Sequence, residues 1–339
     1  MSGDAIEAAR LLLARIGVTP EQLLTTSPDR MAVPTFREYI EQLADAVPAS
    51  TRRAYATYWR RVVDEWGDRR INEPTPLEIQ RLCETQKPQI VTRKNSRGGR
   101  SATEHLVSAL RCLYRHAVAD DLITERNNPA RRVPKPRRLP STRRAIPDDR
   151  LAELFTVAAT TGNDPELDTL ILRLHAETAC RRGGALALRP IDLDADQSLV
   201  MLREKGDTTR WQPVSPTLMR HLRAHAETRQ AVADTRLLRY RIGRPITARR
   251  YDYLWSRIRD QLPWATAQQV SAHWLRHTTL TWVERRYGYA VARAYAGHTD
   301  TSNAGTTATY IRADVQEVAA ALAALTGEPH PLTTPGPRA

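Results

Sequence analysis

Residues 271–280 read SAHWLRHTTL and place two histidines and an arginine within five positions. His273, Arg276 and His277 are spaced i, i+3 and i+4, so on a helix their side chains would share one face. A polar face that can carry positive charge suits an anion, a metal ion or acid–base chemistry. Other parts of the chain distinguish these three options.

A metal site is the weaker interpretation. His273 and His277 have the spacing of two zinc ligands on a helix, but the metalloprotease motif has a glutamate where this chain has Trp274. Arg276 would also oppose a bound cation, because its guanidinium stays charged. The three cysteines have no CxxC spacing, which predicts a reduced, cytoplasmic protein without structural zinc. We therefore expect no metal and no cofactor.

The overall charge favours an anionic partner. Lys and Arg number 51 against 38 Asp and Glu, a formal net charge of +13, which predicts association with a polyanion. No run approaches the roughly 20 apolar residues that a membrane-spanning helix needs. The N-terminus has an acidic start and a short apolar run interrupted by arginine, so it is a poor signal peptide. We expect no membrane partner.

Four further residues could belong to an anion site in the same half of the chain. Arg181 follows a predicted helix, and Lys205 lies at the tip of a predicted β-hairpin. His298 and Tyr310 lie in the loop-to-helix segment AGHTDTSNAGTTATYIRA. Each has an ordinary explanation when taken alone, as a solvated cation, a turn residue or half-buried packing. Their order along the chain carries the functional prediction.

Helical periodicity surrounds these residues. Apolar side chains recur every three to four positions in two groups of segments, separated by a basic, proline-rich stretch. The predicted helices are 34–47, 50–66, 75–86 and 101–123 in the first group, and 148–160, 164–179, 215–228, 247–262, 271–286, 289–296 and 313–325 in the second. Residues 198–215 form the one convincing β segment, two strands joined by a turn. The prediction is a mainly α fold with a small β-sheet (α+β) in two domains.

The predicted divisions follow from periodicity and composition. In chain order they are an N-terminal segment of uncertain structure (1–33), a helical domain (34–128), a basic Pro-rich linker (129–147), a second domain (148–326) and a disordered tail (327–339). Prolines break helices and favour extended backbone in the linker. That linker is either a solvated tether or a strap along a phosphate backbone.

The order Arg, Lys, His-x-x-Arg, Gly-His, Tyr resembles that of the tyrosine recombinases of the phage-integrase type. The family box T-G-L-R-x-x-E-L-x-x-L-x-x-x-D is in register with Thr178, Cys180, Arg181, Leu188 and Asp192. HWLRHT matches H-x-L-R-H-T, AGH matches L-G-H, and TTATY matches the region before the nucleophile. The first domain is similar, by pattern, to the family's helical, SAM-like core-binding domain. The resemblance spans roughly residues 34–325.

The resemblance implies a site-specific recombinase or integrase that cleaves and rejoins duplex DNA through a 3′-phosphotyrosine intermediate, without metal or ATP. All the implied catalytic residues act on one phosphodiester. The implied roles are nucleophile for Tyr310, phosphate clamp for Arg181 and Arg276, base for His273, acid for Lys205 and phosphate hydrogen bonding for His298. His277 occupies a position that is more structural than catalytic in the family.

The resemblance also implies partners. The two domains would clamp double-stranded DNA, and a homotetramer would assemble on paired DNA sites in the cytoplasm, associated with the nucleoid. The helix at 313–325 either docks on a neighbouring protomer or packs on its own domain. An accessory directionality protein is a further expected partner.

Two departures from the family pattern stand out. The family's acidic residue after the first arginine falls at Gly184, so another group must orient Arg181. His298 and Tyr310 are 12 positions apart (310 − 298), which is longer than the family's usual spacing. Tyr295 is a rival nucleophile, but it lies where the family has an apolar core residue. The alternative functions are DNA relaxation of the type IB topoisomerase kind, and a DNA-binding accessory protein that has lost catalysis.

Overall fold

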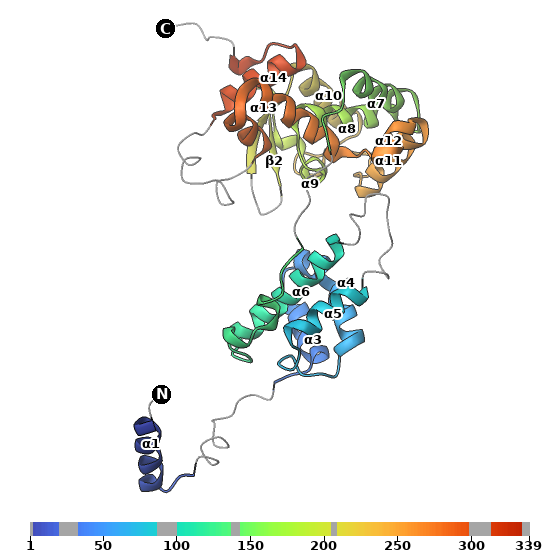
Figure 1. The fold of residues 1–339 in the computed structure, drawn as a ribbon. Helices are drawn as coiled ribbons and strands as arrows, with labels where there is room; N and C mark the ends of the chain where they lie inside the picture. The colour runs from blue at the N-terminus through green and yellow to red at the C-terminus, as the bar shows by residue number, and fades with distance from the viewer. Residues whose placement is uncertain are drawn as a thin grey trace, which may run out of the picture. The chain divides into compact units, whose positions relative to one another are not determined.

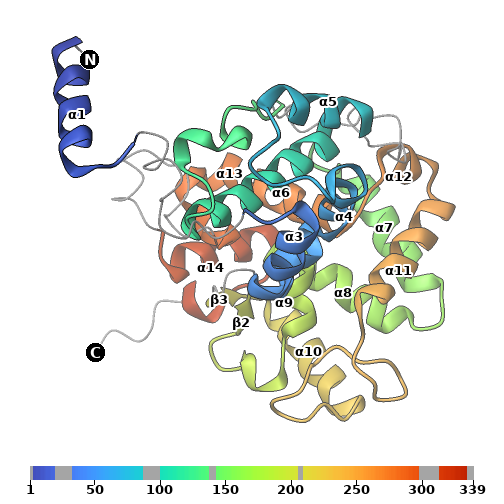
Figure 2. The same cartoon turned by 90° about the horizontal axis from the view of Figure 1, so that it is seen from below.

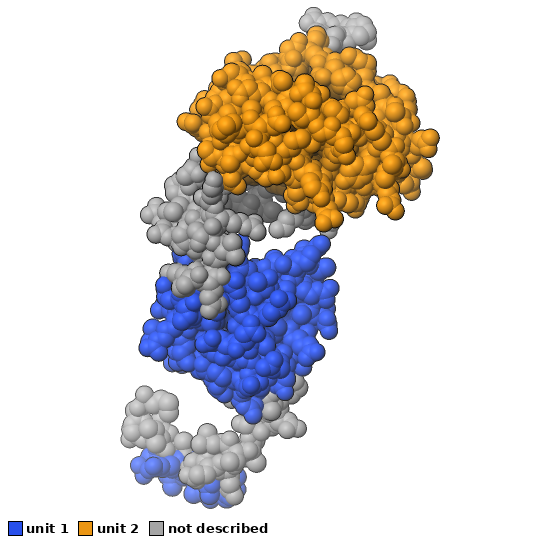
Figure 3. All heavy atoms as spheres, turned by 90° about the vertical axis from the view of Figure 1, so that its right-hand side faces the viewer, with its two compact units in different colours: residues 1–139 blue, residues 140–339 orange. Residues whose placement is uncertain are grey.

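The computed structural model describes residues 3–19, 33–86, 100–136, 143–204, 209–297 and 313–333. Helices predominate in these ranges and the strands form one three-stranded antiparallel sheet, so the predicted α+β class is confirmed (Figure 1). The chain divides into two compact units, residues 1–139 and 140–339 (Figure 3). Within the described ranges, no helix is both long and apolar enough to cross a membrane.

The first unit has an aromatic core. Phe36, Trp59 and Tyr114 are buried, and the Trp59 indole nitrogen donates to the Ala109 carbonyl at 3.2 Å. The Tyr114 hydroxyl donates to the Ile71 carbonyl at 2.9 Å, so both polar groups keep partners inside the core. The elements of this unit are α1 (Gly3–Ile16), α3 (Phe36–Ala46), α4 (Ala49–Trp66), α5 (Pro76–Gln86), α6 (Arg100–Ala119), η1 (Glu125–Asn127) and η2 (Pro129–Arg131).

The two ends of the predicted linker pack into the two units. Ala130 and Val133, at and after the short 3₁₀ helix η2, are buried in the first core, and Ile146 is buried in the second. The Ile146 amide also donates to the Thr278 hydroxyl at 2.9 Å. Proline and arginine content does not prevent a short turn from packing, so the composition placed the start of the linker too early.

The second unit holds the sheet. Its strands β1 (Leu193–Asp194), β2 (Leu199–Arg203) and β3 (Thr209–Pro213) lie in that order, and the predicted β2–β3 hairpin is confirmed with Arg203 opposite Thr209. The sequence does not predict β1, because two residues are too few for a recognisable alternation. The helices are α7 (Asp148–Thr160), α8 (Pro165–Thr178), α9 (Arg182–Ala187), α10 (Pro216–Thr228), α11 (Ala248–Gln261), α12 (Pro263–Gln268), α13 (Ala272–Ala296) and α14 (Val315–Thr326), with short 3₁₀ helices η3 (Pro190–Asp192) and η5 (Pro331–Thr333).

Helix α8 lies at the centre of this unit. It is buried on most sides and contacts α7, α10 and α13, and its buried residues include Asp168, His175 and Glu177 as well as leucines. Helix α14 lies beside α13 and β3 in both views (Figures 1 and 2). Val318, Ala321 and Leu322 of α14 are buried, so in this structure the helix packs on its own domain.

Gly288 interrupts α13. Its φ of 81° and ψ of 172° are non-helical and belong to a region that only glycine adopts without strain. The helix is therefore two segments that meet at Gly288, as the separate predictions of 271–286 and 289–296 indicate.

The prediction of a disordered tail over 327–339 is wrong for residues 327–333. The Glu328 carboxylate accepts a hydrogen bond from the Thr217 amide at 3.1 Å and pairs with Arg173 at 3.0 Å. The His330 ring is buried and its Nε2 donates to the Ser198 carbonyl at 3.2 Å. These long-range contacts order a segment whose composition alone is typical of a disordered terminus.

Candidate active site

Arg181 lies at the junction between α8 and α9. The chain leaves α8 through Ala179, whose φ of 49° is left-handed, and Arg181 is then the N-cap residue of α9 with an extended backbone. A non-glycine residue in this region costs about 1–2 kcal/mol, so surrounding contacts must hold it there. The Ala179 carbonyl accepts a hydrogen bond from Arg276, which is one such contact.

Glu204 orients Arg181. The Arg181 backbone amide donates to Glu204 Oε1 at 2.8 Å, and the Arg181 guanidinium pairs with Oε2. The Glu204 side chain is 2% exposed, whereas that of Arg181 is 42% exposed. The carboxylate is thus buried behind the arginine, which keeps part of its guanidinium available to solvent or to a ligand.

The end of β2 fixes the position of Glu204. Arg203, the last residue of β2, pairs with Asp192, which also binds Arg189 at 3.3 Å. Although burial acts to raise it, hydrogen bonds from Arg203 and Arg189 lower the pKa of Asp192. Asp192 is the last acid of the 178–192 box, so one end of that box anchors the strand that carries Glu204.

Arg276 ties the ends of two helices together. Its guanidinium donates to the Ala179 carbonyl at the end of α8 and to the Ala296 carbonyl at the end of α13, the latter at 2.8 Å. The residue is 4% exposed. Burial, followed by the charge of Arg181, lowers the pKa of Arg276 to about 10, so it remains a cation at neutral pH.

His273 lies one turn before Arg276 and lines the same pocket. This pocket of about 350 Å³ is bounded by Cys180, Arg182, His273 and Arg276, among others. Partial burial, and then the charges of Arg143 and Arg276, lower the pKa of His273. The imidazole is therefore neutral at pH 7 and can accept a proton.

Arg210 of β3 adds a third guanidinium to the cluster. Nη1 donates to Gln212, while Nε and Nη2 are buried with no hydrogen-bond partner among the described residues. Burial lowers the pKa of Arg210, and the nearby charge of Glu204 opposes this effect. A Cβ on Gly297 would come within 2.3 Å of Arg210 Nε, and Gly297 has a φ of 64°. Both features favour glycine before His298.

A buried polar chain supports the backbone of this region. His175 Nδ1 donates to the Cys180 carbonyl at 3.0 Å, since a carbonyl can only accept, and its Nε2 makes a hydrogen bond of 2.9 Å with the Tyr251 hydroxyl. Both side chains are buried. They link α8 and α11 to the residue before Arg181.

Three of the six predicted catalytic residues are therefore brought together: Arg181, His273 and Arg276. Lys205, His298 and Tyr310 lie outside the described residues. The rival Tyr295 is fully buried, and its hydroxyl donates to the Glu177 carbonyl. Burial raises the pKa of Tyr295, so this phenol is neither reachable nor readily ionised.

Among the described residues, His277 belongs to no cluster that could hold a metal ion. Across the described ranges, no group of three or more His, Cys, Asp and Glu side chains could hold a metal ion. His277 is half-buried, and its Nδ1 lies 3.3 Å from the Thr281 hydroxyl of the next turn.

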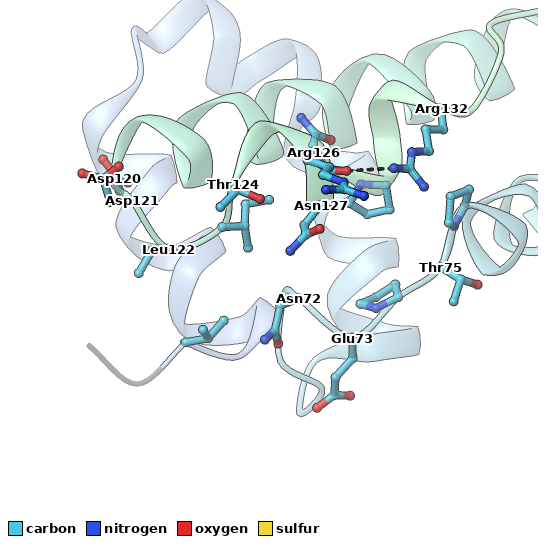
Figure 4. Close-up of a pocket in the computed structure, with 16 residues that line it drawn as sticks. Asn72, Glu73, Thr75, Asp120, Asp121, Leu122, Thr124, Arg126, Asn127 and Arg132 are labelled. Carbon is cyan, nitrogen blue, oxygen red and sulfur yellow. Dashed lines mark hydrogen bonds between the residues drawn. The ribbon is translucent and has the colours of Figure 1, made fainter. Parts of the chain in front are cut away.

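The first unit has a pocket of a different character. A hollow of about 660 Å³ lies between the segment after α6 and the residues before α5 (Figure 4). Glu73, Asp120 and Asp121 line it together with Arg126 and Arg132, and Arg132 donates to the Arg126 carbonyl at 2.9 Å. Its mixed charges do not match the cationic cluster of the second unit, which remains the candidate site.

Sequence reasoning missed three contributors to the site: Glu204, Arg210 and His175. Glu204 directly precedes Lys205, so its place at the hairpin end was a signal that it lies near Arg181. Arg210 and His175 carry no comparable signal, because an arginine in a strand and a histidine in an apolar helix usually have ordinary structural roles.

Comparison with known proteins supplies a family. The model described as the phage integrase family matches residues 144–317, a little over half of the chain. A relative, tyrosine recombinase XerC of Xanthomonas axonopodis pv. citri, is 28% identical over 248 residues, covering 72% of this chain and 78% of the relative. XerC of Xanthomonas campestris pv. campestris strain B100 is 28% identical over 246 residues, covering 71% of this chain and 73% of the relative.

Solved structures share the fold. A lambda integrase dimer bound to a COC′ core site superposes with a TM-score of 0.62 at 15% identity, covering 91% of this chain and 86% of that one. The Tn1549 transposon integrase in complex with a circular intermediate DNA gives 0.61 at 14% identity, covering 83% and 95%. XerH site-specific recombinase bound to palindromic difH substrate gives 0.58 at 13% identity, covering 77% of each chain. At these identities the likeness concerns the fold alone.

Proposed function

Because the chain belongs to the phage integrase family, we propose that it is a site-specific DNA recombinase or integrase that cleaves and rejoins duplex DNA through a 3′-phosphotyrosine intermediate. The observation that carries the proposal is that two guanidiniums, Arg181 and Arg276, lie close enough for the charge of one to lower the pKa of the other, and that Arg276 lines a pocket together with His273, whose pKa is also lowered. This arrangement suits a phosphodiester whose negative charge grows as a nucleophile adds to phosphorus.

The two arginines clamp the nonbridging oxygens of the scissile phosphate. Guanidinium forks match phosphate geometry and keep their charge. Arg276 is held by carbonyls at two helix ends, and Arg181 by a buried carboxylate. Donors fixed in advance stabilise a developing charge without reorganisation, and removing one donor of this kind typically slows a reaction by about 100- to 1,000-fold. Such a clamp supplies the positive charge for which many nucleases use metal ions.

The proton transfers follow from the remaining residues. The Tyr310 oxygen bonds to phosphorus as the bond to the 5′ oxygen breaks, and His273 accepts the phenol proton. Lys205 protonates the leaving 5′ oxygen, and His298 donates a hydrogen bond to the phosphate. The roles of Tyr310, Lys205 and His298 rest on the resemblance of their motifs. A 5′ hydroxyl from another strand reverses the steps, so the bond energy is kept and no ATP is required.

The partners are double-stranded DNA and other copies of the chain. A structure of lambda integrase is a tetramer bound to a Holliday junction, and by analogy this protein forms a homotetramer on paired DNA sites. An accessory protein that sets the direction of recombination would act on that assembly. The net charge of +13 favours association with DNA and makes it sensitive to salt.

Capture of a covalent adduct tests the function. Purified protein is incubated with sheared genomic DNA of the source cell and denatured with detergent, and the protein-linked DNA is recovered and sequenced. The wild type is expected to enrich a discrete site, and Tyr310→Phe none. An adduct that survives Tyr310→Phe overturns the assignment of the nucleophile. Absence of any adduct, together with DNA binding, favours the accessory-protein alternative, and relaxation of supercoiled plasmid without site preference favours the topoisomerase-like one.

A further inference from the structure

We propose that Glu204 is the positioning residue for Arg181, replacing the carboxylate that the phage-integrase box carries at the position of Gly184. The proposal rests on the proposed function, because it concerns how the phosphate clamp is held. Glu204 uses both carboxylate oxygens on one residue: Oε1 accepts the Arg181 amide at 2.8 Å, and Oε2 accepts the guanidinium. Holding backbone and side chain together fixes both the start of α9 and the direction of the guanidinium.

Glu204 and a side chain at residue 184 would compete for the same space. A Cβ built on Gly184 would lie 3.3 Å from Glu204 Cγ and 3.5 Å from Glu204 Oε1. Gly184 lies inside helix α9 and has no left-handed φ, so its backbone accepts other residues. The Arg203 carbonyl oxygen lies 3.5 Å from the same Cβ, which is an ordinary contact, so the tightest contact is with Glu204. A carboxylate side chain at 184 would therefore meet Glu204, and the two positions are alternative places for one charge.

The negative charge of Glu204 also offsets the positive charges of three neighbouring arginines, Arg181, Arg210 and Arg276. Arg181 and Arg210 each act to lower the pKa of Arg276, whereas Glu204 acts to raise it. The Glu204 side chain is 2% exposed, pairs with Arg181 and acts electrostatically on Arg210 and Arg276. A buried carboxylate is stable only when paired, so its place in the site depends on Arg181. Reciprocally, loss of the carboxylate leaves the guanidinium free to turn away from the phosphate.

Moving the carboxylate from one position to the other tests the proposal. Single-turnover cleavage is measured on a nicked duplex carrying the captured site, from which the short 5′-hydroxyl strand dissociates. Glu204→Ala is expected to slow cleavage about 100-fold, since a small misplacement of a catalytic group has effects of this size. Gly184→Glu alone is also expected to slow cleavage, because the added side chain meets Glu204. The double variant Glu204→Ala/Gly184→Glu is expected to recover most of the lost rate.

A matched control separates orientation from charge. Gly183 is on the same helix turn, and a Cβ there meets nothing within 4 Å. The control variant Glu204→Ala/Gly183→Glu has the same net charge as Glu204→Ala/Gly184→Glu, but its new carboxylate lies outside the space that the Glu204 side chain occupies. Its cleavage rate is therefore expected to stay as low as that of Glu204→Ala. Glu204→Gln, which keeps the shape and loses the charge, serves if Glu204→Ala fails to fold by circular dichroism.

A second readout does not depend on cleavage. Relaxation of the Arg181 Nε signal in ¹⁵N-arginine-labelled full-length protein, assigned with Arg181→Lys, is expected to report an ordered side chain in the wild type and in the rescued double variant. It is expected to report a mobile one in Glu204→Ala. An ordered Arg181 in Glu204→Ala, or wild-type cleavage by that variant, overturns the positioning role. A wild type that orders Arg181 but forms no adduct with any DNA overturns the proposed function instead.

Discussion

Replacing Arg276 by lysine tests the clamp most directly, because the substitution keeps the charge and removes the fork. Arg276 uses two nitrogens to bind two carbonyls that lie at the ends of α8 and α13. A lysine has one nitrogen and cannot bind both carbonyls while also facing a phosphate. One buried charge-assisted hydrogen bond is then lost, which corresponds to about 1.5–3 kcal/mol of unfolding free energy.

The effect on cleavage should be larger than the effect on DNA binding. Loss of one transition-state donor predicts a decrease of about 100- to 1,000-fold in the single-turnover rate, or about 2.7–4 kcal/mol. The dissociation constant for DNA, measured in the Tyr310→Phe background, should change little because Arg276 is one of 51 Lys and Arg residues and the substitution keeps its charge. Arg285→Lys, an exposed position on the same helix, is the matched control and should leave both quantities unchanged. An Arg276→Lys protein of wild-type stability that cleaves within threefold of the wild type would refute the reasoning.

Three other outcomes are expected. Because burial and neighbouring arginines lower the pKa of His273, its neutral form persists below pH 6.5, so the cleavage rate should fall only below that pH; a pH–rate profile with a midpoint above 6.5 contradicts its role as base. Asp168 is fully buried and paired with two arginines, so Asp168→Ala should lower the unfolding free energy by about 3–5 kcal/mol in chemical denaturation, whereas exposed Asp196→Ala should have almost no effect. Burial lowers the pKa of His225 to about 4, so the folded state excludes a proton that the unfolded chain binds. Stability should be complete above pH 6.5 and fall by about 3 kcal/mol as the pH approaches 4, and His225→Gln should flatten that dependence.

The helices and the hairpin could be predicted because their signals are local. Apolar spacing identifies α8 and both segments of α13 without knowledge of their neighbours, and the period-two pattern identifies β2 and β3. The tail could not be predicted, because Glu328 and His330 are ordered by Thr217 and Ser198, more than a hundred positions away in the sequence. Composition indicates how a segment behaves in isolation. In residues 327–333, contacts with distant residues determine the structure instead.

Part of the candidate site could also be predicted from local sequence signals. Arg181, His273 and Arg276 belong to short motifs whose spacing identifies them. Glu204, which orients Arg181, does not belong to such a motif. The motif position at which the family has an acidic residue is Gly184 in this chain.

The sequence by itself determined the family and the two helical groups, and it supplied the residues proposed for the site, since each depends on residue types at short, fixed spacings. The tertiary structure decided which carboxylate binds Arg181. Glu204 reaches Arg181 because Asp192 anchors the end of β2 and because Gly184 leaves the space free. That contact joins residues 23 positions apart, and only the packed hairpin and helix bring them within hydrogen-bonding distance.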